Sequence, residues 1–176
     1  MLNTEDSLVL VIDLQEKLVN AVGKYSPVEK ARKIIQAADI LKVPVIFTEQ
    51  YPKGLGETVE ELKAINSTIL EKTSFSALAT DEVHKKVKEL NKKQIIIFGI
   101  EAHICVYQTI CDLLNEGYEV YFVKDASASR NKYEFKTGCE LIRQKGGYVT
   151  CCEITLFEWL RSSKHPNFKE IQNLIK

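Results

Sequence analysis

The chain has 176 residues, about the length of one globular domain. Hydrophobic residues make up 45% of it and charged residues 27%, which are ordinary values for a globular protein and exclude a disordered or fibrous one. The 24 Lys and Arg residues balance 24 Asp and Glu residues, so the sequence lacks the basic excess that is typical of nucleic-acid-binding proteins.

Continuous apolar runs indicate strands that are buried on both faces of a sheet. In chain order these runs cover residues 8–12, 43–48, 94–99, 118–123 and 148–152, with residues 68–72 as a weaker candidate. Apolar residues at helical spacing occur between or after them, in segments 28–41, 106–114, 141–142 and 168–175. This alternation predicts an α/β protein with a parallel sheet and helices on both faces. In such a sheet, ligands bind beyond the carboxyl ends of the strands, near the switch point in strand order.

The organisation of the chain is simple. We find no internal repeat, low-complexity tract or Gly/Ser-rich linker, and we expect one domain over residues 1–176. No apolar run approaches the ~18 residues of a membrane helix, and residues 1–6 lack the basic region of a signal peptide. The five cysteines include no C-x-x-C pair, which favours free thiols over disulfides or a zinc site. We therefore expect a cytoplasmic protein with no membrane or nucleic-acid partner.

The first strand is followed directly by Asp13, for which two interpretations remain open. Asp13 begins the sequence Asp-Leu-Gln-Glu, with Glu16 three residues later, which is typical of a capping box at a helix start. A carboxylate at the carboxyl end of a strand is also placed for chemistry. Spacing alone favours the cap, and the two roles can coexist.

Lys72 ends the weak strand candidate and precedes the polar residues Thr73 and Ser74. A lone lysine beside a loop is usually solvated, so its surroundings alone favour a surface residue over a functional one.

Cys105 gives the clearest signal of chemistry. The helical pattern after strand 94–99 begins at about His103, so Cys105 falls in the first turn of a helix at the carboxyl edge of the sheet. Free N–H groups and the helix dipole there favour an anion, lower a thiol pKa and can bind a developing oxyanion. The alternative is a cysteine that packs against the sheet, which is the interpretation we favour for the other four: Cys111, Cys139, Cys151 and Cys152.

His103 is a poor candidate for a base that activates Cys105, because residues two apart point to different sides of a helix. We expect His103 to form part of a pocket wall instead. The loop over residues 48–56 contains one carboxylate and no histidine, and the sequence has neither G-x-G-x-x-G nor a P-loop motif. We therefore expect no metal and no nucleotide cofactor.

Taken together, these residues resemble the isochorismatase-like cysteine hydrolase superfamily, which includes nicotinamidases, N-carbamoylsarcosine amidases and isochorismatases. The resemblance rests on Asp13, on Lys72 and on the sequence Gly-Ile-Glu-Ala-His-Ile-Cys-Val over residues 99–106. The segments 48–56 and 165–172 resemble the subgroup of isochorismatase domain-containing proteins. The similarity extends over residues 7–176.

This resemblance implies a Rossmann-like, three-layer α/β/α fold with a six-stranded parallel sheet. It implies a catalytic triad of Asp13, Lys72 and Cys105, in which Asp13 takes the thiol proton and Lys72 keeps Asp13 ionised. It also implies a cis peptide between Ile100 and Glu101 that aims the N–H groups of Glu101 and Cys105 into one oxyanion hole. Members of the family are commonly oligomeric, so we expect a homo-oligomer.

The expected function is hydrolysis of a small amide or related acyl compound through a thioester-type intermediate, without a cofactor. Metal-binding nicotinamidases carry Asp-x-His where this chain has Glu49-Gln50-Tyr51, so nicotinamidase activity is not expected. The segment 125–130 is interpreted as a turn that caps the next helix. Five residues are expected to face the substrate, although each could equally be core or surface: Gln15, Tyr51, Phe75, His103 and Ile104.

Two alternatives to this hydrolase remain. One is a catalytically weak binding protein that retains the fold, and the other is a thiol-based redox sensor. The apolar stripe at residues 168–175 must pack on something, either in the same subunit or in another copy.

Overall fold

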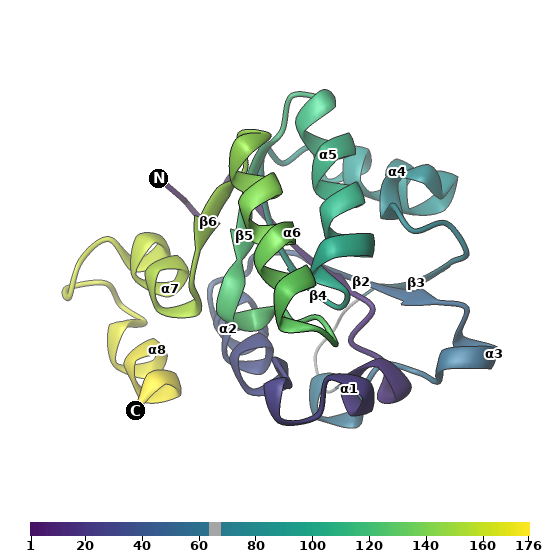
Figure 1. The fold of residues 1–176 in the computed structure, drawn as a ribbon. Helices are drawn as coiled ribbons and strands as arrows, with labels where there is room; N and C mark the ends of the chain where they lie inside the picture. Colours follow the sequence, from purple (N-terminus) through teal and green to yellow (C-terminus); the bar gives the residue numbers. More distant parts are fainter. Residues whose placement is uncertain (64–67) are drawn as a thin grey trace.

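The computed structural model describes residues 1–63 and 68–176, and at its centre is a six-stranded, all-parallel sheet (Figure 1). The strands lie in the order β3-β2-β1-β4-β5-β6. Their bounds are Ser7–Ile12 for β1, Val45–Gln50 for β2, Thr68–Lys72 for β3, Gln94–Gly99 for β4, Glu119–Val123 for β5 and Tyr148–Thr150 for β6. The predicted six-stranded parallel sheet is therefore confirmed, and its switch point lies between β1 and β4.

Helices connect the strands and follow the last of them. The α-helices are α1 (Glu16–Val22), α2 (Val28–Ile40), α3 (Pro52–Leu55), α4 (Asp81–Glu89), α5 (Tyr107–Asn115), α6 (Lys132–Gln144), α7 (Cys152–Leu160) and α8 (Phe168–Ile175). Short 3₁₀ turns cover η1 (Gly23–Tyr25), η2 (Glu60–Leu62), η3 (Ala77–Ala79) and η5 (Lys124–Ala126). A π-helical turn, η4 (Ala102–Val106), leads into α5.

Two apolar cores lie on the two faces of the sheet and give the fold its three layers. Val9 and Val11 of β1 pack on the side of α2, α7 and α8. Leu8, Leu10 and Ile12 of the same strand pack on the side of α4, α5 and α6, where α5 and α6 lie side by side in Figure 1. Because both faces of β1 are buried, the strand reads as a continuous apolar run rather than an alternating one.

The end of β4 passes very close to β1. Gly99 has a φ of 142°, a conformation that favours glycine, and a Cβ there would collide with the carbonyl oxygen of Ile12. The N–H of Ile100 donates a 3.0 Å hydrogen bond to that same oxygen. This approach brings the segment that contains Cys105 next to Asp13.

The predicted bounds of β3, β4 and α8 agree with the structure. The predicted strand over 148–152 is wrong at its end, because β6 stops at Thr150 and Cys152 begins α7. A short apolar run does not distinguish a strand from a buried helix start.

The C-terminal stripe packs within the chain, since α8 contacts α2 and α7 and Ile171 is fully buried. Self-association therefore remains a prediction. Across the described residues, no helix combines the length and the apolar character that crossing a bilayer demands.

Candidate active site

A buried ion pair between Asp13 and Lys72 lies at the carboxyl edge of the sheet. The Oδ2 atom of Asp13 is 2.7 Å from the Nζ of Lys72, and both side chains are fully buried. Oδ1 of the same carboxylate accepts a 2.7 Å hydrogen bond from Oγ1 of Thr48 in β2. Lys72 ends β3, which lies two strands and roughly 10 Å from β1. A long side chain is therefore needed to cross β2 and reach Asp13.

Two interpretations drawn from local sequence are wrong here. The N-cap of α1 is Gln15 rather than Asp13, because the Asp13 carboxylate is turned toward Thr48 and Lys72. Lys72 is not a solvated loop residue, because its tertiary partners bury it. Long-range contacts decide both cases, and a local pattern does not contain them.

Gln50 and two carbonyl groups complete the surroundings of Lys72. Its Nζ donates to Oε1 of Gln50 at 2.6 Å and to the backbone oxygens of Ser74 and Phe75 at 3.2 and 3.3 Å. Gln50 is fixed in turn by the amide of Gln15, which accepts from the Gln50 N–H at 2.8 Å and donates to its carbonyl at 3.0 Å. The ammonium is therefore held in one position beside the carboxylate.

Cys105 lies in the π-helical turn η4, with its thiol close enough to the Asp13 carboxylate for the two groups to change each other's pKa. The backbone N–H of Glu101 lies near the sulfur and acts to lower the thiol pKa. Burial first and the negative charge of Asp13 second raise the pKa of Cys105 to about 12, although Lys72 and the Glu101 N–H oppose the change. The expectation that a helix start lowers this pKa is therefore wrong, because desolvation and a neighbouring carboxylate outweigh the dipole.

The carboxyl group of Asp13 is affected in a similar way. Burial raises its pKa above the usual value, while the positive charge of Lys72 and hydrogen bonds from Lys72, Thr48 and Cys105 lower it. Burial is therefore the largest cause of the raised pKa of both groups, and Lys72 opposes the shift at each of them.

Glu101 borders this site on the other side. The peptide bond between Ile100 and Glu101 is cis. The Glu101 carboxylate accepts from Nε of Arg130 at 2.6 Å and from the Arg130 backbone N–H at 3.1 Å. Cys105 is therefore flanked by two acid–cation pairs, Asp13 with Lys72 and Glu101 with Arg130.

A cavity of about 350 Å³ opens onto Cys105. Phe75 and Ile104, two of the five predicted substrate-facing residues, are part of its wall. The full lining consists of Lys17, Leu18, Ala21, Gln50, Leu55, Phe75, Ile100, Glu101, Ile104, Cys105 and Arg130.

The other three predicted residues lie outside this lining. Gln15 is buried and ties Gln50 to Gly56, whose carbonyl it reaches at 2.6 Å. Tyr51 is exposed, with its ring over Gly54. His103 turns away from the cavity, and its Nδ1 shares a 2.9 Å hydrogen bond with Oγ of Ser129.

Sequence reasoning missed four residues of the site: Lys17, Thr48, Gln50 and Arg130. Thr48 and Gln50 belong to the end of β2, where the rule for parallel sheets directs attention, so a search of every strand end could have found them. Arg130 belongs to the segment interpreted as a helix-capping turn. The N-cap of α6 is in fact Asn131, whose side chain accepts from the Tyr133 N–H at 2.8 Å.

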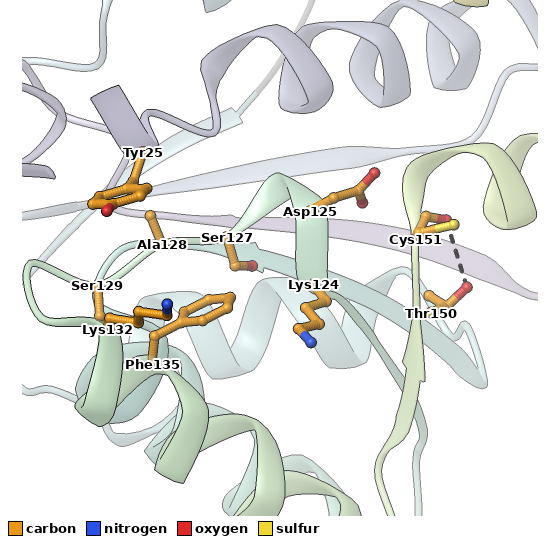
Figure 2. Close-up of a pocket in the computed structure, with 10 residues that line it drawn as sticks. All are labelled: Tyr25, Lys124, Asp125, Ser127, Ala128, Ser129, Lys132, Phe135, Thr150 and Cys151. Carbon is orange, nitrogen blue, oxygen red and sulfur yellow. Dashed lines mark hydrogen bonds between the residues drawn. The ribbon is translucent and has the colours of Figure 1, made fainter. Parts of the chain in front are cut away.

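A second hollow of about 450 Å³ lies at the same edge of the sheet, beyond β5 and β6. Figure 2 shows Tyr25 and Phe135 on its sides, with Lys132 between Ser129 and Phe135 and the thiol of Cys151 farther along. No residue lines both this hollow and the cavity at Cys105.

Glu49, the one carboxylate of segment 48–56, lies within β2 and already binds Thr58. Oε1 of Glu49 accepts hydrogen bonds from the N–H of Thr58 at 2.6 Å and from its hydroxyl at 2.7 Å. In the part of the chain that the structure describes, no group of three or more His, Cys, Asp or Glu residues is arranged to hold a metal ion.

Comparisons with known proteins give the class to which this fold and site belong. The family model of the isochorismatase domain matches residues 7–154. Isochorismatase domain-containing protein 2 from Danio rerio is 41% identical over 176 residues, which cover 99% of this chain and 89% of the relative.

Two solved structures share the architecture. MAR1 ribonuclease from Caenorhabditis elegans has a TM-score of 0.92 and 40% identity, covering 99% of this chain and 91% of that one. YcaC from Pseudomonas aeruginosa, solved with hexane-2,5-diol and covalent acrylamide, has a TM-score of 0.91 and 26% identity. The match covers 98% of this chain and 90% of YcaC. The architecture is thus that of hydrolase-like α/β proteins with polar groups gathered at the switch point. The chain belongs to the isochorismatase family, as the resemblance of its motifs predicts.

Proposed function

We propose that this protein is a cysteine hydrolase that cleaves a small amide or related acyl compound, with Cys105 as nucleophile, Asp13 as proton carrier and Lys72 as the cation that holds Asp13. One observation carries the proposal. Lys72, Asp13 and Cys105 form a continuous chain of contacts that ends at a cavity able to admit a small molecule.

The first half-reaction acylates the thiol. The Cys105 proton passes to the Asp13 carboxylate as sulfur bonds to the amide carbon, and the carbonyl electron pair moves to oxygen. The Glu101 N–H, which lies near the sulfur, would stabilise that oxyanion. The C–N bond then breaks, and Asp13 returns the proton to the departing amine.

The second half-reaction regenerates the thiol. Asp13 takes a proton from water as the oxygen attacks the thioester carbon, and the C–S bond breaks to release the carboxylic acid and restore the sulfur proton. Lys72 keeps the carboxylate in the ionised form that both steps require. The raised pKa of Cys105 fits this scheme, since the nucleophile forms by proton transfer to Asp13 rather than by prior ionisation.

The relatives suggest which compounds to assay. The covalent acrylamide of YcaC supports small amides as first test compounds. The name of the C. elegans relative makes ribonuclease activity an alternative to be assayed in parallel. The zero net charge of this chain gives no support to RNA binding, which depends on neutralising phosphates. A binding protein with little turnover is the other alternative.

The deciding experiment compares turnover of a panel of small amides and of an RNA oligonucleotide by wild type, Cys105→Ala and Cys139→Ala. Cys139 is a matched control because its side chain is as buried as that of Cys105 but belongs to α6. We expect amide turnover that Cys105→Ala abolishes and Cys139→Ala preserves, with circular dichroism showing both variants folded. Full activity of Cys105→Ala would contradict the proposal.

A second readout does not depend on finding the substrate. Iodoacetamide labelling at pH 7.5, mapped by mass spectrometry, gives a rate for each of the five cysteines. We expect Cys105 to react faster than Cys139, and Asp13→Asn to slow Cys105 at least tenfold. A Cys105 as inert as Cys139 would leave the binding protein as the better explanation.

A further inference from the structure

The cavity at Cys105 carries an excess of positive charge at its mouth. Lys17 and Arg130 contribute two cations to the lining, and Glu101 is its single carboxylate among the described residues. The remaining walls are mainly apolar, with Leu18, Leu55 and other nonpolar side chains. A neutral amide would need no such pair of cations.

The backbone and the Nε atom of Arg130 are held in place by hydrogen bonds. The Ile100–Ala128 bridge extends the sheet past the end of β4, and the Ala102 N–H donates to the Ala128 carbonyl at 2.9 Å. The backbone N–H and Nε of Arg130 then both donate to the Glu101 carboxylate. The guanidinium is therefore anchored beside the cavity rather than free in solvent.

The outer part of the guanidinium remains available. Within residues 1–63 and 68–176, its two Nη groups donate no hydrogen bond, whereas Nε pairs with Glu101. The Arg130 side chain is 60% exposed, whereas that of Glu101 is 6% exposed. A molecule entering the cavity therefore meets far more of the Arg130 cation than of the Glu101 carboxylate that balances it, although both residues line the cavity. Paired guanidinium N–H groups match the two oxygens of a carboxylate.

Lys17 supplies a second cation from α1. Its Nζ donates to the carbonyl oxygen of Gly54 at 2.7 Å, which holds the ammonium at the mouth. Among the residues that the structure describes, no carboxylate pairs with it. The two cations come from distant parts of the chain and converge on one opening.

We propose that Arg130, assisted by Lys17, selects small amides that carry a carboxylate a few bonds from the scissile carbonyl. This inference rests on the proposed function and deepens it by naming the charge of the substrate. Arg130 is a specificity-determining residue in this scheme, and the chemistry remains with Cys105 and Asp13. Monoamides of short dicarboxylic acids have the required charge and fit the cavity size.

The first test uses two alkylating reagents that differ by one charge. Iodoacetate and iodoacetamide are reacted with Cys105 at pH 7.5 in low salt, and the ratio of their rates is divided by the same ratio for glutathione. We expect a normalised ratio above one in the wild type, a fall of about three- to tenfold in Arg130→Gln, and a partial return in Arg130→Lys. Raising the ionic strength should lower the wild-type ratio.

Lys132→Gln is the matched control. It removes a lysine from the neighbouring hollow at the same sheet edge, outside the Cys105 cavity, and should leave the ratio unchanged. Lys17→Gln should lower the ratio by a smaller factor than Arg130→Gln.

The second test compares succinamate with its neutral counterpart succinamide as substrates. We expect the larger kcat/KM for succinamate, and a loss confined to succinamate in Arg130→Gln. A purely structural role for Arg130, through the position of Glu101, would slow both reagents and both amides equally and would overturn the inference.

The outcomes separate the inference from the function on which it rests. A reactive Cys105 with no preference for iodoacetate, together with turnover of neutral amides, contradicts the charge selection and leaves the hydrolase intact. An unreactive Cys105 and no amide turnover contradict the proposed function, and the inference falls with it.

Discussion

The two acid–cation pairs beside Cys105 have similar composition but opposite exposure. Both side chains of the Asp13–Lys72 pair are fully buried, whereas Arg130 is 60% exposed over a buried Glu101. A buried charge must keep its partner, because water cannot replace it. An exposed guanidinium can exchange its solvent for a ligand at small cost. The difference suggests that the Asp13–Lys72 pair transfers a proton and that the Glu101–Arg130 pair binds the substrate.

The largest effect should come from removing the buried acid. Asp13→Asn keeps the size of the side chain and removes the group that accepts the thiol proton. We expect kcat on a neutral amide to fall by about 10²- to 10⁴-fold, the usual contribution of a general base. Arg130→Gln should change the same quantity by less than tenfold. Equal losses in the two variants would erase the proposed division of roles.

Stability should separate the pairs next. Lys72→Met leaves the Asp13 carboxylate buried without its cation, which should lower the free energy of unfolding by about 3–5 kcal/mol. The measurement is urea denaturation at pH 7 followed by circular dichroism. In the double variant with Asp13→Asn the loss should be smaller than the sum of the two single losses, because no charge is then left unpaired.

Alkaline pH provides a third comparison. The pKa of Cys105 is raised from 9.0 to about 12 in the folded protein. Between these values the unfolded thiol loses its proton while the folded one keeps it, so stability falls as pH rises. The wild type should lose about 1.4 kcal/mol per pH unit more than Cys105→Ala above pH 9. Parallel curves for the two proteins between pH 9 and 10.5 would count against a buried, protonated thiol.

The smallest effect is expected from the outer pair. Arg130→Met should cost about 1 kcal/mol or less at pH 7, because the side chain is largely exposed and Glu101 keeps the backbone N–H of residue 130 as a donor. The same denaturation assay applies. A loss as large as that of Lys72→Met would show that the exposed pair also supports the fold.

The sequence predicts the fold better than it predicts the site. Apolar runs indicate β1 and β4 because strands buried on both faces need them, and the position of Cys105 after β4 follows from the same pattern. Lys72 illustrates the limit, since its surroundings suggest a solvated residue and family resemblance alone suggests a role. Its burial depends on β3 lying beside β2, a tertiary fact that local sequence does not contain.

Arg130 shows a related limit, because the local structure is predicted correctly and the place of the side chain is not. Its neighbours predict a turn before a helix, and the chain does turn there before α6. The side chain becomes part of the cavity because of the Ile100–Ala128 bridge, which joins segments 28 positions apart. The lowered pKa predicted for Cys105 fails for a related reason, because the helix start is visible in the sequence and the buried carboxylate facing it is not.

The loop between β2 and η2 has a consequence for protein engineering. Its beginning is held by the hydrogen bond from the Gln50 N–H to the Gln15 side chain. Its end is held by the hydrogen bond from the Thr58 N–H to the Glu49 carboxylate. Libraries that vary positions 52–55 would therefore change the cavity wall near Leu55 while both ends of the segment stay hydrogen-bonded. The contact of Gln50 with Lys72 would be undisturbed. Because both ends of this segment are fixed by hydrogen bonds, longer segments can be inserted between them when a larger acyl group is to be accommodated.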